Sequence, residues 1–245
     1  MLPNFKARVA KDDTRYEMSV QTPSYYEIAT QLPPGASVVF HDVSWDEYLE
    51  LLEQVGEAPG LRISYDSGSL QLMTISAEHE KYALFLNRVV STLGLRLRIE
   101  ILFFGSATMK KRKRRKGKEP DACFYVQSAP VIGNKIQLDF ETDPPPDIAV
   151  EIDVHHDSRS SFPIYAALGV PEIWRYDGHA MTIYQLVRGE SEDQPGEYAE
   201  RDANEALPML TSSILTELLE RMRREGELAT LLAFDEWLQS RPILR

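Results

Sequence analysis

The stretch PDIAVEIDV at residues 146–154, together with EPDACFYV at residues 119–126, joins carboxylates to short runs of aliphatic or aromatic residues. Such runs predict two β-strands. Because side chains alternate along a strand, Asp147, Glu151 and Asp153 should share one face of the second strand, opposite its aliphatic residues. Acids gathered in this way repel one another unless a cation such as Mg²⁺ neutralises them. The pattern predicts either a metal site on a sheet or a solvated acidic sheet edge.

The composition is that of a globular protein. The chain has 245 residues, of which 43% are hydrophobic, and this suffices for one domain with terminal additions. The single cysteine, Cys123, excludes an internal disulfide, suits a reducing compartment and is expected to be a small core residue. Neither a secretory leader nor a membrane span of ~18 apolar residues is predicted, so the cytoplasm is the default location.

Charge is distributed unevenly along the chain. The net charge of -11 is unusual for a nucleic-acid-binding protein, since an acidic surface repels a polyanion. Eight of the nine residues at 110–118 are nevertheless basic, namely Lys110, Lys111, Arg112, Lys113, Arg114, Arg115, Lys116 and Lys118. This run predicts a flexible cationic arm that binds phosphates beside the acidic strands. The alternative is a solvated loop, or an arm that pairs with the protein's own acidic surface.

Local signals predict the order of elements before the acidic strands. The first 35 residues, which are polar and interrupted by proline, predict a loosely packed leader. Ser44 and Ser76 are placed to cap two helices, and Gly94 is placed to end the second. Between these helices, residues 62–65 and 69–73 predict a hairpin. The alternating segment at 95–104 predicts a strand that enters the core.

Further signals follow the basic run. A short strand is expected near residues 135–138 and a short helix at 163–168, beginning at a proline. Residues 173–176 and 181–186 flank Asp177-Gly178 and predict a second hairpin. Beyond Pro208 the sequence predicts helices, which could cover a sheet edge or pair with a second subunit.

His79 is a further candidate for the site. On the helix predicted after Ser76, the apolar stripe is centred near Val89, and Glu78 and His79 project toward it whereas Glu80 points away. His79 should therefore face the sheet. It could serve the acidic site or be an ordinary packing residue.

Five motifs in a fixed order resemble the Uma2 family of restriction-endonuclease-like proteins. They are SWDEY (44–48), EHE (78–80), EPD (119–121), PDIAVEID (146–153) and YAALGVPEIWRY (165–176). The resemblance implies an α/β (α+β) fold, a restriction-endonuclease-like mixed sheet flanked by helices. It divides the chain into an N-terminal leader at 1–40, a core at 41–215 and a C-terminal helical extension at 216–245.

The resemblance also assigns roles to residues. Asp121 and Glu151 take the positions of metal ligands, the backbone carbonyl of Ile152 that of a third ligand, and His79 that of a recurrent helical histidine. The signature lysine is missing, since position 153 is aspartate and position 161, where many relatives carry a lysine, is serine. Arg159 is the nearby cation, and an arginine cannot act as a general base near neutral pH.

The leading hypothesis is a nuclease that hydrolyses phosphodiesters with Mg²⁺ or Mn²⁺, DNA being expected rather than RNA. Asp121, Glu151 and Asp153 would hold the ion, while Arg159 or a lysine of the basic run would offset developing charge. Two alternatives stay open. One is a catalytically silent nucleic-acid-binding module, and the other is an assembly protein whose C-terminal helix forms a homodimer. No membrane partner is expected.

Overall fold

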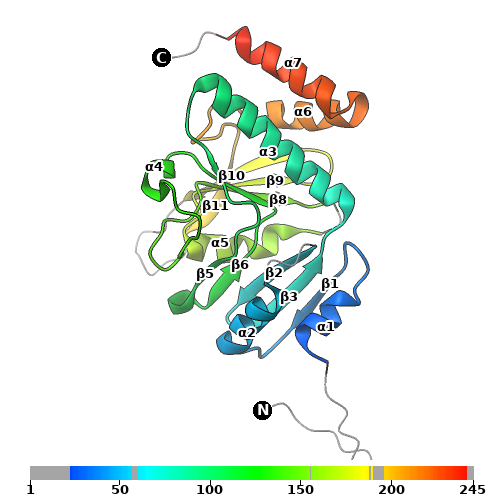
Figure 1. Ribbon diagram of the computed structural model, residues 1–245, viewed down its shortest axis with the longest axis vertical. Helices are drawn as coiled ribbons and strands as arrows, with labels where there is room; N and C mark the ends of the chain where they lie inside the picture. The colour runs from blue at the N-terminus through cyan, green and yellow to red at the C-terminus, as the bar shows by residue number, and fades with distance from the viewer. Residues whose placement is uncertain (1–22, 57–59, 155, 188, 190–195, 242–245) are drawn as a thin grey trace, which may run out of the picture.

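The computed structural model describes residues 23–56, 60–154, 156–187, 189 and 196–241. They form a mixed α+β fold with two sheets (Figure 1). The small sheet has the strand order β1 (Ser37–Phe40), β3 (Ser69–Thr74), β2 (Leu61–Asp66), β6 (Lys116–Lys118) and β5 (Met109–Lys111). The large sheet has the order β11 (Glu197–Arg201), β10 (Met181–Val187), β9 (Glu172–Tyr176), β8 (Ile148–Ile152), β7 (Ala122–Tyr125) and β4 (Leu102–Phe103).

The large sheet is mixed because β8 and β9 run parallel while its other strand pairs are antiparallel. Parallel neighbours need a crossover, which is supplied by η2 (Ser158–Ser161) and α5 (Phe162–Leu168). Helix α5 lies between the large sheet and the β5–β6 hairpin (Figure 1). It contributes to an apolar cluster that also contains Met109 of β5 and Ala149 of β8.

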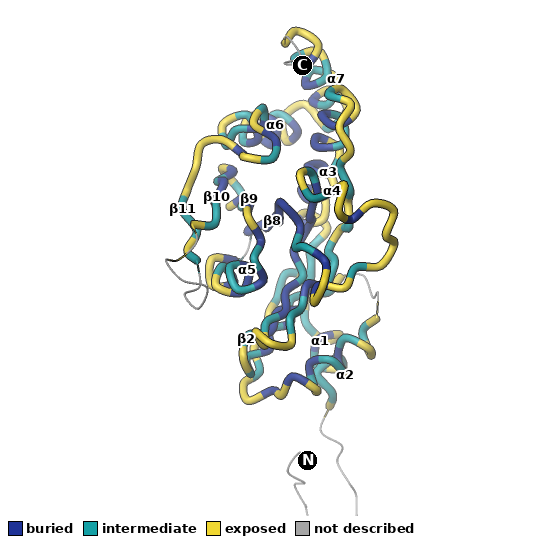
Figure 2. Tube along the Cα trace, turned by 90° about the vertical axis from the view of Figure 1, so that its left-hand side faces the viewer, coloured by how far each residue is buried: buried dark blue, intermediate teal, exposed yellow. Residues whose placement is uncertain are grey.

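Helix α3 (Ala77–Leu97) covers the other face of the large sheet. Its residues Phe85, Leu86, Val89 and Val90 are buried with Ile148, Val150 and Ile152 of β8. All five residues of β8 are buried, as the dark tube in Figure 2 shows. Because β8 is enclosed on both faces, a carboxylate on this strand must be paired inside the protein or hold a cation.

The two helices predicted beyond Pro208 are α6 (Ser212–Glu225) and α7 (Glu227–Gln239). They extend the core over α3, since Leu219, Met222, Phe234 and Leu238 belong to the same apolar cluster as the large sheet. Ion pairs of Arg88 with Glu227 and of Arg96 with Asp235 join α3 to α7.

Helices α1 (Tyr25–Thr30) and α2 (Trp45–Val55) cover the small sheet. Ser24 and Ser44 cap them with complete capping boxes, and the cap at Ser44 confirms the prediction. The loose packing expected of the first 35 residues is wrong from residue 23 onward, because Ser24 caps helix α1 and Ala29 is buried. Residues 1–22 lie outside the described part of the chain.

The strand predicted at 95–104 is wrong over most of its length. Gly94 does not end α3, which continues to Leu97 and stops at Arg98 in the left-handed conformation, with φ 57°. Gly94 instead permits a close approach, because a Cβ there would lie 3.0 Å from the Cδ1 of Ile101. What remains of the predicted strand is β4, Leu102–Phe103.

Two further expectations for loops are corrected. The basic run is not a flexible arm, because β5, the 3₁₀ turn η1 (Arg112–Arg114) and β6 build it into the small sheet as a hairpin. The short strand expected near 135–138 is absent from that described segment, where Ile136 is 92% exposed and contributes to no core. Cys123 is buried in β7 as predicted, and burial raises the pKa of its thiol to about 12.

Other predicted elements are confirmed. Ser76 caps α3 through the backbone N–H of His79, α5 begins at a proline-containing turn, and the two predicted hairpins form as β2–β3 and β9–β10. All these elements rest on signals within a few residues of one another, which is why the sequence reveals them.

Candidate active site

Asp121 stands at the start of β7, directly beside β8. Its backbone N–H donates to the carbonyl of Val150 at 2.9 Å, and its Oδ2 accepts from the N–H of Ile152 at 2.7 Å. The register of Ala122 with Val150 therefore brings Asp121 next to Glu151. The two acidic segments of the sequence meet as predicted.

The Asp121 carboxyl is buried among cations. Arg62, on β2, donates from Nε to Oδ1 at 3.2 Å, and the Nε2 of His79 lies 3.1 Å from Oδ2. Burial alone would raise the pKa of Asp121, but His79, Arg62 and the N–H of Ile152 hold it below the usual value. Asp121 is therefore a carboxylate at neutral pH.

His79 faces the site from the first turn of α3, as the apolar stripe predicts, and it is 7% exposed. Neither ring nitrogen has a hydrogen-bond partner, although Nε2 is close to Asp121. The contact is thus a short charge–dipole or ion-pair contact without hydrogen-bond geometry.

Glu151 of β8 is 3% exposed and has two partners on the same oxygen. Its Oε1 accepts from the hydroxyl of Tyr165 on α5 and lies 3.1 Å from the Nζ of Lys118 on β6. Burial raises the pKa of Glu151 to about 7, against the charge of Lys118 and with a contribution from Asp121. Because both contacts use Oε1, no donor within the described residues occupies Oε2.

Lys118, one of the lysines of the basic run, places its ammonium group beside Glu151. It comes from the end of the basic run, yet its side chain is 6% exposed and lies beside Glu151, with Nζ 5.8 Å from the centre of the Tyr165 ring. Lys118 therefore lies inside the protein and not on the exposed surface of the basic run. A buried ammonium pairs with the buried acid instead.

Arg62 and Tyr165 are further site residues that the sequence did not single out. Arg62 stands in the predicted hairpin strand β2, whose burial pattern turns it inward. Tyr165 opens the YAALGVPEIWRY motif, and burial raises the pKa of its hydroxyl, which stays protonated and donates to Glu151. The available signal for Arg62 was a charged residue inside a strand that also carries Leu61, Ile63 and Tyr65.

The other predicted site residues form hydrogen bonds and ion pairs that, within the described part of the chain, do not include Asp121 or Glu151. Asp153 accepts from the N–H of Ser158 at 2.8 Å, from its hydroxyl at 3.0 Å and from Arg175. Asp147 accepts from the N–H groups of Val126 and Ser128. The exposed Arg159 pairs with Asp157, and no ion pair of the described residues joins it to Asp121 or Glu151.

The rest of the basic run surrounds the hairpin. Lys111 donates to the carbonyl of Leu168 at 2.9 Å, Arg115 to the hydroxyl of Tyr65 at 3.3 Å, and Lys116 pairs with Asp66. Residues 112–115, which we name the hairpin tip, are exposed.

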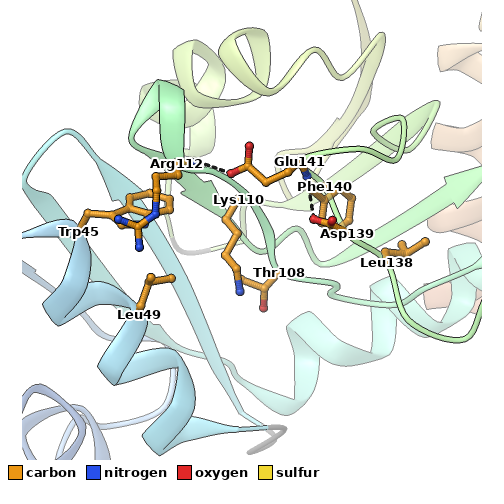
Figure 3. A pocket seen from close by; sticks show the side chains of 9 residues that line it. All are labelled: Trp45, Leu49, Thr108, Lys110, Arg112, Leu138, Asp139, Phe140 and Glu141. Atoms are coloured by element: carbon orange, nitrogen blue, oxygen red, sulfur yellow. Dashed lines mark hydrogen bonds between the residues drawn. The ribbon is translucent and has the colours of Figure 1, made fainter.

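Figure 3 shows Lys110 and Arg112 lining a small pocket of about 140 Å³. Arg112 lies over the ring of Trp45 with its Cζ 6.0 Å from the centroid, and its backbone N–H donates to Glu141 at 2.6 Å. Lys113 and Arg114, in contrast, form no ion pair among the described residues. Lys110 and Arg115 of the same run likewise form no ion pair among the residues that the structure describes.

The sequence profile of the Uma2 family, described as "Putative restriction endonuclease", matches residues 45–219. The chain belongs to the Uma2 family. The match covers Asp121, Glu151, His79 and Lys118, and the family description relates this Uma2 protein to restriction endonucleases.

A solved structure is also similar. It is a protein described as a putative nuclease belonging to DUF820 from Anabaena variabilis ATCC 29413, with 15% identity and a TM-score of 0.47 over 71% of this chain and 98% of the other. No curated protein matches the chain. No helix in the described part of this Uma2 protein is long and apolar enough to cross a membrane.

The donor set of the Uma2 site fits a hard divalent cation. Each oxygen of Asp121 accepts one hydrogen bond and keeps a lone pair, and Oε2 of Glu151 has no donor. The described residues contain no group of three or more His, Cys, Asp or Glu side chains that could hold a metal ion. Mg²⁺ commonly binds through one or two carboxylates and completes its shell with water and phosphate oxygens.

Proposed function

We propose that this Uma2 protein is a nuclease that hydrolyses phosphodiester bonds with Mg²⁺ or Mn²⁺ held by Asp121 and Glu151. The observation that carries the proposal is the burial of these two carboxylates side by side, with Lys118 on Glu151. The carbonyl of Ile152, whose N–H binds Asp121, is the proposed third ligand. Asp153 is left out, because Ser158 and Arg175 occupy its carboxylate.

The bound ion would lower the pKa of a water molecule and polarise the scissile phosphate. Lys118 would stand beside the phosphate and offset the negative charge that develops on it, which is the role of the absent signature lysine. Its ammonium is held by Glu151 and faces the Tyr165 ring, so little side-chain freedom is lost when the substrate binds.

His79 and Arg62 would hold Asp121 in place and keep it ionised. His79 is also the proposed proton carrier, because its imidazole is buried at the site, with Nε2 3.1 Å from Asp121, and neither ring nitrogen has a hydrogen-bond partner among the described residues. Arg159 is not part of this mechanism, since its side chain is exposed and bound to Asp157.

DNA is the proposed substrate, in keeping with the family description, and the hairpin tip is the proposed contact with its backbone. Phosphates neutralised by residues 112–115 would release counterions and guide the strand toward the site. A homodimer through the exposed Leu228 and Leu232 of α7 belongs to the same proposal.

The test is incubation of supercoiled plasmid and of linear DNA and RNA with the protein, with Mg²⁺, with Mn²⁺ or with EDTA. We expect nicking that needs the ion and that disappears in Asp121→Asn and Glu151→Gln. Asp147→Asn is the matched control, because that aspartate is equally buried but binds the 126–128 loop. Nicking that survives in Asp121→Asn, or that needs no ion, would contradict the ligand assignment.

A nucleic-acid-binding protein without catalysis is the second candidate, and the exposed hairpin tip is the observation that favours it. In that case DNA binding would weaken steeply with salt and no ion would produce nicking. The plasmid assay, run beside a binding assay, separates the two functions.

A further inference from the structure

A large pocket adjoins the candidate active site on the side of Arg62. It has about 730 Å³ of free volume and lies between β2, the first turn of α3 and the segment that follows β4. Arg62 lines this pocket and also donates to Asp121, so the pocket and the proposed metal ligands share one residue. Whatever occupies the pocket lies next to the reacting centre.

The pocket has the size of a small-molecule site. Ligand pockets in proteins usually have about 300–1,000 Å³. A nucleotide is a ligand of this size, whereas the full width of a duplex is not. A base could therefore enter only if it is unpaired or turned out of its helix, which costs least at a base that has no partner.

The walls suit a flat base with polar edges. Leu61, Ile75 and Phe104 supply apolar surface, and Phe104 is fixed by an edge-on contact with Tyr125 at 5.6 Å between ring centres. Ser76, Ser106 and Thr108 add hydroxyl groups. Aromatic and apolar surface stacks on any base, while hydroxyl groups can bind its edge.

Charge decides which part of a nucleotide enters. Glu80 and Glu119 line the pocket and would repel a phosphate from its interior. Arg62, the cation of the lining, stands where the pocket meets Asp121. The phosphate would thus stay at Arg62, near the scissile position, and the base would point inward.

Glu119 gives the pocket a preference among bases. Its two oxygens accept from the hydroxyl of Thr108 at 2.5 Å and from the N–H of Ile63 at 2.9 Å, which fixes the carboxyl and leaves one lone pair on each oxygen. A carboxylate accepts hydrogen bonds from the exocyclic amino group of cytosine, whereas an unpaired thymine has no amino group and offers only its ring N3–H.

We propose that this pocket is a subsite for one unpaired nucleotide, preferably cytosine over thymine, so that the preferred substrate is nucleic acid with an extruded or single-stranded base next to the cleaved bond. This inference rests on the proposed function, since the pocket is read as part of the nuclease site. It adds the structural class of the substrate, which the family description does not specify.

The experiment measures binding in EDTA, so that it does not depend on catalysis. Fluorescence anisotropy is recorded with three hairpin DNAs that are identical except for a single unpaired dC, a single unpaired dT or no unpaired nucleotide. We expect the DNA with unpaired dC to bind about tenfold more tightly than the paired DNA, as stacking of one base allows. The DNA with unpaired dT should fall between them.

Two tryptophan variants test the pocket itself. Ala77→Trp fills the pocket from an exposed position in the first turn of α3, and Ala229→Trp is the matched control on an exposed position of α7. Ala77→Trp should abolish the preference for unpaired dC and leave binding of the paired DNA unchanged, while Ala229→Trp should change neither. Thermal unfolding of both variants checks that they fold.

Equal binding of the three DNAs by the unmodified protein, or absence of binding, would overturn the proposal. A preference that persists in Ala77→Trp would overturn the assignment to this pocket, and equal binding of dC and dT would overturn the role of Glu119. If the preference is found but no ion produces cleavage, the proposed nuclease function fails and the subsite stands.

Discussion

The two ends of the β5–β6 hairpin carry the same kind of charge in opposite environments. At one end, the Lys118 side chain is 6% exposed and pairs with Glu151 of the large sheet. At the other, residues 112–115 are exposed and Lys113 and Arg114 have no ion-pair partner in the described chain. One run of basic residues thus supplies both an internal ammonium for the site and an external charge for a polyanion. The comparison teaches that neighbouring basic residues can have different roles, which depend on how the strands that carry them pair.

The largest difference should appear in catalysis. We expect Lys118→Met to lower the rate of cleavage by about 100- to 1,000-fold, because a preorganised charge beside the phosphate is lost. Arg114→Met, the matched change at the hairpin tip, should leave the rate at saturating substrate within about twofold. Single-turnover cleavage of a labelled DNA measures both. A Lys118→Met rate within tenfold of the unmodified protein would remove the buried end from the mechanism.

The second difference is in stability, and it tests what holds Lys118 in place. A Cβ at Gly117 would lie 2.1 Å from the hydroxyl oxygen of Tyr48, a buried ring stacked on Tyr65 at 4.8 Å. Gly117→Ala should therefore lower the free energy of unfolding by about 2–3 kcal/mol, as overpacking of a core does. Urea unfolding measures this loss. The loss caused by Gly117→Ala should be smaller in a protein that also carries Tyr48→Ala. An equal loss with and without Tyr48→Ala would contradict the contact between position 117 and Tyr48.

The third difference concerns pH. The pKa of Glu151 rises from 4.5 to about 7 in the folded protein, chiefly through burial, so between these values the folded state binds more protons than the unfolded state. Raising the pH from 5 to 8 should then destabilise the protein through this group, by on the order of 2 kcal/mol. Glu151→Gln should lack that contribution.

Urea unfolding of the unmodified protein and of Glu151→Gln is measured at pH 5 and at pH 8. The decrease in the free energy of unfolding from pH 5 to pH 8 is then compared between the two proteins. The same comparison with Arg114→Ala should match the unmodified protein, because the hairpin tip is exposed. If Glu151→Gln loses as much stability between pH 5 and pH 8 as the unmodified protein does, the raised pKa of the Glu151 carboxyl is contradicted.

The smallest difference should be in nucleic-acid affinity. Arg114→Ala should weaken binding a few-fold at moderate salt and lower the slope of log affinity against log salt by about 1. Lys118→Ala should leave that slope unchanged, since its charge is neutralised inside the protein. Anisotropy titrations from low to high salt provide the slopes. Equal effects of the two substitutions would mean that the ends of the hairpin do not differ in role.

The sequence predicts the parts of this molecule that depend on near neighbours. The caps at Ser44 and Ser76, the helix at Pro163 and the turn at Asp177-Gly178 are such features, and each is present. The convergence of Asp121 and Glu151 was also predictable, because each lies in a recognisable strand motif and the two strands pair directly. The inward orientation of His79 was predictable from the apolar stripe of its helix.

The contacts of the site that join distant segments were not predictable. Lys118 reaches Glu151 because β6 pairs with β2, at Ser64, and because the small sheet packs against α5. No local pattern specifies either event. The same holds for Gly94, which looks like a helix stop until the return of the chain to Ile101 shows that it serves close packing. Long-range pairing thus decides which cation of the chain lies beside Glu151.

Cys123 has a practical consequence. The chain contains no other cysteine, and this thiol is enclosed in β7 with its pKa raised to about 12. Maleimide reagents attack the thiolate, so the native side chain should stay unlabelled as long as the protein is folded. A cysteine introduced at Arg114 or at Ala229 could then carry a single fluorophore or spin label without removal of the native thiol. The hairpin tip and the C-terminal helix can in this way be followed one at a time by spectroscopy.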